Sequence, residues 1–143
     1  MSMNVAEMEK HTEAHGEGMC GQTGSFCWNE LLASDVSGAS KFYSQLFGWE
    51  AADFQGAPGG MKYSLLKKDG HDIGGLMQRP KEQMPPQWLA YVKVDNVDAS
   101  AQKAGSLGAK VVMPPMDIPN VGRIAVFVDP QGAALGIFQP AKQ

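Results

Sequence analysis

Hydrophobic and polar positions change their period along the first half of the chain, and these changes predict a series of short elements. Short segments rich in apolar residues lie at 25–32, 49–54, 61–66 and 73–77, whereas apolar residues recur at three- and four-residue steps over 36–47. Short runs are typical of strands, whereas the helical spacing predicts a helix with Ser34 or Asp35 as its N-cap and Gly48 as its stop. The Asp69-Gly70 pair predicts a hairpin turn. The first half is therefore predicted to be a β-α-β-β-β unit.

The second half repeats this order of elements. Its pattern predicts a strand over 88–94, a helix over 95–105, turns at 114–115 and 129–132, and further strands at 110–113, 121–128 and 133–138. The segment 78–87 contains three prolines, which cannot donate to a central ladder, and so separates the halves as a linker. Helices separated from hairpin-linked strands predict an α+β fold, with helices outside and a curved sheet whose other face lines a groove.

Identical residues also recur sixty positions apart in the two halves. They lie at a strand entry, a helix start, a helix exit, a hairpin turn and a module end: Trp28 and Trp88, Asp35 and Asp95, Ala39-Ser40 and Ala99-Ser100, Gly48 and Gly108, Asp69 and Asp129, Pro80 and Pro140. A fixed period indicates two copies of one unit, each too small to bury its own apolar face. We therefore expect the two modules to pack as a pair around a central cleft that carries the function.

Length and composition are those of one compact domain. The 143 residues contain 43% hydrophobic residues, enough for a single core. We predict a flexible tail over 1–23 and one domain over 24–140, made of module one (25–79), a linker (80–87) and module two (88–140). His11 and His15 in the tail stand four apart, a metal-site spacing, but the tail offers no partner strand for such a site. Their role stays open at this point.

Charge and hydropathy exclude several classes of partner. The net charge is −3 and the chain has no basic run that could follow a phosphate backbone, which excludes nucleic acid as an expected partner. No apolar stretch approaches the length of a membrane span, and the N-terminus lacks the pattern of a signal peptide. These features predict a cytoplasmic protein that does not contact membranes.

Two segments carry a resemblance to a known family. The helix and its end at 34–49, with Phe-Tyr-x-x-Leu-Phe-Gly-Trp, and the late Asp-Pro-x-Gly hairpin at 128–133 resemble the vicinal oxygen chelate superfamily. That superfamily includes glyoxalase I, extradiol dioxygenases, fosfomycin resistance proteins and bleomycin-binding proteins. The resemblance covers residues 25–140. It implies paired βαβββ modules in a half-open curved sheet around a small-molecule site, and a homodimer as the default assembly.

The resemblance also implies where a divalent metal would be bound. Metal-dependent members hold the ion with His or Glu on the first and last strands of each module, and these positions fall here on Trp28, Leu89 or Trp88, Gly75 and Gly136. None of these side chains can coordinate a metal, because indole only donates, leucine is inert and glycine has no side chain. We therefore expect no metal and no other cofactor. Paired tryptophans facing glycines would instead give an aromatic-walled cavity.

Two charged residues are candidates for the polar chemistry of this cavity. Glu30 lies two residues beyond Trp28 and thus on the same strand face, as an anchor or as a catalytic acid or base. Arg123 could grip a carboxylate or phosphate bidentately. The predicted ligand-binding residues are Trp28, Glu30, Gly75, Met77, Trp88, Tyr91, Arg123, Gly136 and Phe138.

The main hypothesis is a glyoxalase/bleomycin-resistance-like protein that binds a small organic ligand between its modules without the usual metal. The first alternative is an enzyme of lyase, isomerase or dioxygenase type that uses Glu30 as acid or base, or a metal at a displaced site. The second is a structural module that dimerises across exposed faces. Each candidate residue also has a simpler interpretation: the tryptophans as core, Glu30 as a solvated carboxylate and Arg123 as a surface residue.

Overall fold

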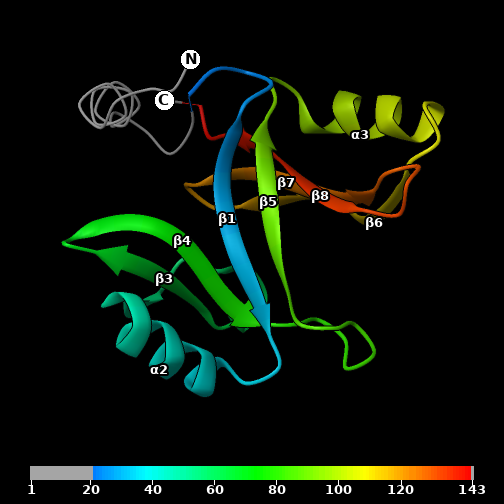
Figure 1. Ribbon diagram of the computed structural model, residues 1–143. Coiled ribbons are helices and arrows are strands. Elements are labelled where there is room, and N and C mark those ends of the chain that lie inside the picture. The colour runs from blue at the N-terminus through cyan, green and yellow to red at the C-terminus, as the bar shows by residue number, and fades with distance from the viewer. Residues whose placement is uncertain (1–20, 143) are drawn as a thin grey trace, which may run out of the picture.

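The computed structural model describes residues 21–142, which form one curved eight-stranded sheet with two helices (Figure 1). Module one contains β1 (Phe26–Ala33), α2 (Val36–Phe47), β2 (Glu50–Phe54), a short 3-10 turn (Pro58–Gly60), β3 (Tyr63–Lys68) and β4 (His71–Gln78). Module two contains β5 (Gln87–Lys93), α3 (Val97–Ser106), β6 (Lys110–Ile118), β7 (Gly122–Val128) and β8 (Ala134–Pro140). The predicted α+β class and the paired β-α-β-β-β order are confirmed.

The two modules meet edge to edge at the centre of the sheet. The strand order is β2-β3-β4-β1-β5-β8-β7-β6, with β1 and β5 antiparallel to each other. In each module the first strand pairs in parallel with the last one, β1 with β4 and β5 with β8. Figure 1 shows β1 and β5 side by side, with α2 beside β4 and α3 beside β6, β7 and β8. The modules are thus related by an approximate twofold axis between the two central strands.

Local sequence signals account for the helix and hairpin of module one. Asp35 caps α2 by accepting a hydrogen bond from the backbone N–H of Gly38 at 3.1 Å, and Gly48 ends the helix with a left-handed φ of 74°. Asp69 and Gly70 have φ values of 52° and 80°, as a two-residue hairpin turn with the right-handed strand twist requires. Both predictions are confirmed.

The second helix begins one residue later than the sequence repeat predicts. Asn96 caps α3 by accepting from the N–H of Ala99 at 3.0 Å, whereas Asp95 accepts a hydrogen bond from the Thr23 hydroxyl at 2.8 Å. The N-caps Asp35 and Asn96 are sixty-one positions apart, so the structural repeat differs by one from the repeat of identical residues. A shift of one residue reverses the face on which every strand side chain lies.

The prediction of a turn at 114–115 is wrong. Strand β6 continues through Pro114 and Pro115 to Ile118, with irregular register from Val111 to Met116. Because β6 is an edge strand that pairs with β7 alone, and its register is interrupted between Met113 and Met116, the two prolines lie where the ladder can tolerate missing N–H groups.

Apolar side chains form clusters on both faces of the sheet. The cluster under α2 contains Leu31, Ala33, Leu66 and Leu76, and the cluster under α3 contains Val97, Ala101, Ala125 and Ile137. The third cluster includes no helical residue and contains Leu32, Leu89, Tyr91, Ile124, Val126 and Phe138. We call the face that carries it the helix-free face. It is built by strands of both modules.

The last residues of the predicted tail are attached to the sheet. The Lys93 ammonium donates to the carbonyl of Gly21 at 3.1 Å, and Gly24, the first residue after the tail, donates its N–H to the carbonyl of Lys93 at 2.8 Å. His11 and His15 lie outside the described residues. Within residues 21–142, neither helix has the length and apolar character that crossing a membrane would require.

Candidate functional site

A buried carboxylate lies at the centre of the helix-free face. Strand alternation turns Trp28, Glu30 and Leu32 of β1 toward this face, and Glu30 is paired in register with Leu89 of β5 and Gly75 of β4. Glu30 is 7% exposed and is the one charged residue among residues 21–142 that is fully buried. Since a buried charge is stable only when it is hydrogen-bonded, its partners define the site.

Two tyrosines hold this carboxylate, and a tryptophan supports one of them. Tyr63 donates its hydroxyl to Oε1 of Glu30 at 3.0 Å, and Tyr91 donates to Oε2 at 2.9 Å. The indole N–H of Trp28 donates in turn to the Tyr63 oxygen at 3.0 Å. We call these four residues the carboxylate network. It joins β1, β3 and β5, and therefore both modules.

Two glycines make room for the two tyrosines. A Cβ atom at Gly75 would overlap the hydroxyl of Tyr63, and a Cβ atom at Gly136 would overlap the ring of Tyr91. Gly136 is the register partner of Tyr91, and Gly75 is the register partner of Glu30. The phenol groups therefore cross the sheet surface where any other residue would place a side chain.

Burial sets the protonation behaviour of the carboxylate network. Loss of hydration raises the pKa of Glu30 above its ordinary value of 4.5, against the opposing effect of hydrogen bonds from Tyr91 and Tyr63. Burial, followed by the nearby charge of Glu30, also raises the pKa of both tyrosines. The tyrosines thus remain protonated donors, while Glu30 holds a proton more readily than an exposed glutamate does.

The residues of this site do not fit a divalent metal ion. Glu30 supplies a single carboxylate whose two oxygens already accept hydrogen bonds, and the last-strand positions are glycines covered by phenol groups. Throughout residues 21–142, no group of three or more His, Cys, Asp or Glu side chains is placed to hold an ion. A divalent ion in a protein site normally has three or more such ligands.

Most of the predicted site residues share the helix-free face. Phe138 belongs to its buried cluster and Met77 and Trp28 pack against that cluster. The other predicted residues on this face belong to the carboxylate network or are its two glycines: Glu30, Tyr91, Gly75 and Gly136. The structure brings these seven predicted residues together. Their contact with a ligand stays a prediction.

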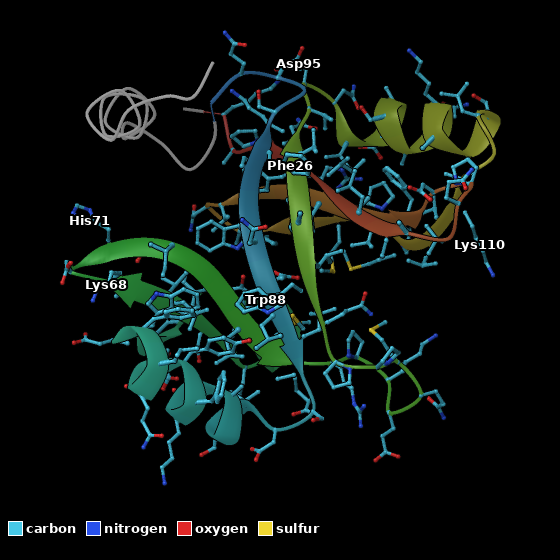
Figure 2. All side chains as sticks on the ribbon, in the orientation of Figure 1. Phe26, Lys68, His71, Trp88, Asp95 and Lys110 are labelled. Atoms are coloured by element: carbon cyan, nitrogen blue, oxygen red, sulfur yellow. The ribbon has the colours of Figure 1, made fainter. Side chains whose placement is uncertain are left out.

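The prediction that Trp88 faces the same cavity as Trp28 is wrong. Leu89 is the partner of Glu30 across β1 and β5, so its neighbour Trp88 points to the opposite face. There its indole N–H donates to the hydroxyl of Tyr43 on α2 at 3.3 Å, and the side chain is 43% exposed. Figure 2 shows Trp88 at the end of β5 that lies nearer to α2. The pair of aromatic walls does not form.

Arg123, the predicted ligand clamp, lies on another face of the sheet, and its contact with a ligand stays a prediction. Its Nε and Nη2 atoms bind the two carboxylate oxygens of Asp98 at 2.7 and 2.9 Å, and Nη1 binds Asp117 at 3.0 Å. Arg123 follows the face of β7 that carries Ala125 and packs toward α3. Its donors are therefore committed to carboxylates of the protein, away from the helix-free face.

Tyr63 is the site residue that the sequence analysis missed. It has no identical residue sixty positions later, so the repeat gave no signal for it. The hairpin around Asp69-Gly70 did carry a signal for Tyr63, because this hairpin pairs Tyr63 with Met77 and Leu65 with Gly75. A tyrosine two residues from the partner of a glycine can lay its ring across that glycine.

Comparison with known proteins places this fold in a family. The model of the Glyoxalase/Bleomycin resistance protein/Dioxygenase superfamily matches residues 26–137. The protein named "Putative glyoxylase CFP32" of Mycobacterium tuberculosis is 39% identical over 128 residues, which are 90% of this chain and 49% of that protein. The "Anthracycline biosynthesis protein DnrV" of Streptomyces peucetius is 34% identical over 81% of this chain and 47% of its own length. The chain thus spans about half the length of these relatives.

A solved structure shares the architecture. Methylmalonyl-CoA epimerase from Mycobacterium tuberculosis superposes with a TM-score of 0.59 at 18% identity, covering 87% of this chain and 94% of the epimerase. At this level of identity the likeness establishes the fold and leaves the chemistry to be argued from the site.

Proposed function

The chain belongs to the Glyoxalase/Bleomycin resistance protein/Dioxygenase superfamily, and from this premise we propose that it binds a small planar organic molecule on its helix-free face, without a divalent metal. The observation that carries the proposal is the carboxylate network. A buried glutamate with tyrosines on both oxygens occupies the centre of the face, where the family resemblance places an ion. It offers a ligand a polar contact in apolar surroundings, which is the usual composition of a small-molecule site.

The surroundings of the network favour an aromatic or apolar ligand. Beside the partly buried indole of Trp28, four methionines pack against the apolar cluster of this face, Met77, Met84, Met113 and Met116. Thioethers are flexible and make favourable contacts with aromatic rings, so a methionine-rich surface adapts to ligands of differing outline. The relative named for anthracycline biosynthesis supports a polycyclic aromatic class of ligand.

We propose binding without a metal because the site offers too few side chains that could coordinate one. A metal would compete with the tyrosine hydroxyls for the two oxygens of Glu30, and it would gain no further ligand from Gly75 or Gly136. Hydrogen bonds from neutral tyrosines take the place of the cation in stabilising the carboxylate. We therefore expect binding to be unchanged by chelators.

The test is a thermal-shift and fluorescence titration with planar aromatics, with and without EDTA and added Mn²⁺, Ni²⁺ or Zn²⁺. A compound that binds the native state raises the melting temperature by mass action. The matched variants are Trp28→Ala and Trp88→Ala, which remove the same side chain from the helix-free face and from the α2 face. We expect Trp28→Ala to weaken binding about tenfold or more, and Trp88→Ala to leave the affinity within about twofold.

Two results would contradict this function. Equal loss of affinity in both tryptophan variants would move the ligand away from the helix-free face. Stoichiometric metal in protein purified without chelators, lost in Glu30→Gln, would show that the carboxylate serves an ion.

An enzymatic role for Glu30 is the second candidate, and it is favoured by the raised pKa of this buried carboxyl group. A carboxylate with a raised pKa is a stronger base than an exposed glutamate, and such a group can take a proton from a carbon acid and return it. The measurement is NMR detection of ligand protons exchanging with heavy water. Exchange that disappears in Glu30→Gln, while the affinity is retained, would support catalysis; exchange at an unchanged rate would exclude Glu30 as the base.

A further inference from the structure

A group of large apolar side chains forms a patch over α2 and the neighbouring strands. Tyr43 lies at its centre, with its ring centroid 5.4 Å from that of Trp49 and 5.5 Å from that of Trp88. The Phe42 ring meets Tyr43 edge-on at 5.0 Å, so the rings form one contiguous surface. We call this surface the α2 patch, and its members are Phe42, Tyr43, Leu46, Phe47, Trp49 and Trp88.

Four large members of the α2 patch are open to solvent. Between 43% and 57% of the surface is exposed in each of Phe42, Leu46, Phe47 and Trp88. Side chains of this kind have about 150–250 Å² each to bury, so the four together expose about 400 Å² of apolar surface. A standard protein interface buries about 800 Å² on each partner, of which somewhat more than half is apolar. The patch therefore supplies the apolar area that one side of a stable interface requires.

The equivalent helix of module two carries no such surface. Helix α3 faces solvent with small or polar residues, among them Asp98, Gln102 and Lys103. Helix α2 instead exposes Phe42 and Leu46 and buries no residue. Since both helices occupy the same place in their modules, the exposed apolar side chains of α2 are not a requirement of the fold. A contiguous patch of this size commonly marks an interaction surface.

The α2 patch can meet an identical copy of itself without charge repulsion. Its six members are uncharged, and the one charged residue of α2, Lys41, lies about 100° around the helix from Phe42 and about 140° from Leu46. Twofold symmetry brings a surface onto its own copy, so a charged patch would face like charges. An uncharged helix surface avoids this cost, and packing against a second helix is the usual way to cover an apolar stripe.

The length of the curated relatives also favours a second copy over an unrelated partner. The regions that match this chain make up 49% of the Mycobacterium tuberculosis protein and 47% of the Streptomyces peucetius protein. Each relative therefore carries about as much further polypeptide in the same molecule. Two copies of this chain would assemble a similar amount of protein.

We propose that the α2 patch binds the same patch of a second copy of this chain and forms a twofold-symmetric dimer. Trp88 lies on the face opposite to Trp28, so this interface leaves the helix-free face outside. The inference goes beyond the proposed function and does not depend on it. At concentrations below the dissociation constant the single chain prevails, and unfolding experiments there report on α2 without its cover.

The first measurement is sedimentation of the full chain between about 1 and 500 µM, which covers dissociation constants of the micromolar class. The variants are Leu46→Glu in the α2 patch and, as the matched control, Leu107→Glu, which changes an exposed leucine outside the patch. We expect Leu46→Glu to weaken the dimer about tenfold or more and Leu107→Glu to leave it within about twofold. More than half of each leucine is exposed in the single chain, so both variants should keep native circular dichroism.

The second measurement identifies the covered surface by acrylamide quenching of tryptophan fluorescence. Quenching of wild type should fall as the concentration rises through the dissociation constant, because dimerisation covers the Trp88 indole. Trp88→Phe should lose most of this dependence, whereas Trp28→Phe should keep it. Each variant is followed beside its own sedimentation curve.

Three results would overturn the inference. A wild type that stays monomeric over the whole range would exclude a second copy as the occupant of the patch. A monomer whose Trp88 is nevertheless protected from acrylamide would assign the cover to another segment of the same chain. A dimer that Leu46→Glu and Leu107→Glu weaken equally, or not at all, would have its interface elsewhere.

Discussion

The two modules share a backbone plan and differ in chemistry. In the sixty-one-residue register set by the helix N-caps, the residues of module one that form the carboxylate network have these counterparts in module two: Glu30 and Tyr91, Tyr63 and Ile124, Trp28 and Leu89. The glycines Gly75 and Gly136 keep the same place in both. Module one thus supplies most of the polar groups and module two most of the apolar wall. A duplicated scaffold can therefore carry an asymmetric site without any change in strand order.

The two helices differ as well. Helix α3 buries Val97 and Ala101, at 0% and 5% exposure, whereas α2 has no buried residue. Phe42 and Leu46 of α2 are both 57% exposed and Phe47 is 49% exposed. Because burial of an apolar stripe provides most of the stability of a helix in a protein, the helix of module two contributes more to the free energy of unfolding.

The largest effect should come from adding a side chain at either of the two equivalent glycines, Gly75 and Gly136. We expect Gly75→Ala and Gly136→Ala each to destabilise the fold by about 3 kcal/mol, because the new Cβ overlaps a tyrosine that is buried or partly buried. Urea unfolding followed by circular dichroism measures the change.

Gly105→Ala is the matched control for these substitutions. Its new Cβ would meet no atom within 4 Å, and alanine is the better helix former, so this change should be neutral or stabilising by up to about 1 kcal/mol. Losses below about 1 kcal/mol at Gly75 or Gly136 would show that the tyrosines can leave the glycine surfaces at little cost.

A smaller effect should separate the helices. Val97→Ala in α3 should cost about 2 kcal/mol, because it opens a cavity in a fully buried cluster. Leu46→Ala in α2 should cost less than about 1 kcal/mol, because more than half of that side chain is already in water. Equal losses in parallel urea titrations would mean that α2 is covered by another surface in solution.

The smallest effect concerns the pH dependence of the carboxylate network. Burial raises the folded-state pKa of Glu30 above 4.5, so the folded protein binds this proton more tightly than the unfolded chain does. The resulting stability is fully present below pH 4.5 and is lost as the pH rises through the folded-state pKa. Glu30→Gln lacks this dependence.

The measurement is the difference in melting temperature between wild type and Glu30→Gln across pH 4 to 8. The difference should favour wild type most at the acidic end and fall steadily toward neutral pH. A difference that instead grows with pH would mean that the tyrosine hydrogen bonds lower the pKa of Glu30 more than burial raises it.

The order of the elements could be predicted because local chemistry fixes it. Asp35 and Gly48 delimit a helix through capping groups within the same segment, and the Asp69-Gly70 turn requires left-handed backbone that few other pairs adopt. The turn predicted at Pro114-Pro115 was wrong, because the effect of proline on a strand depends on whether that strand lies at an edge of the sheet.

The part of the site that was predicted correctly is the part that lies on a single strand. Trp28 and Glu30 had to share a face because they are two apart on one strand. Trp88 was assigned to the wrong face because its face depends on the register between β1 and β5, which are distant in sequence. A register shift of one residue moves every side chain of a strand to the other face. The repeat of identical residues differed from the structural register by that one residue.

The sequence by itself thus determined the fold class, the paired modules and the face of Glu30, since these follow from capping, turns and strand alternation within short segments. The tertiary structure alone decided that Tyr63 and Tyr91 meet on Glu30 and that Arg123 is paired with Asp98. The hydrogen bond from Tyr91 to Glu30 joins residues sixty-one positions apart. Such contacts depend on the register and curvature of the whole sheet, and no local pattern encodes these.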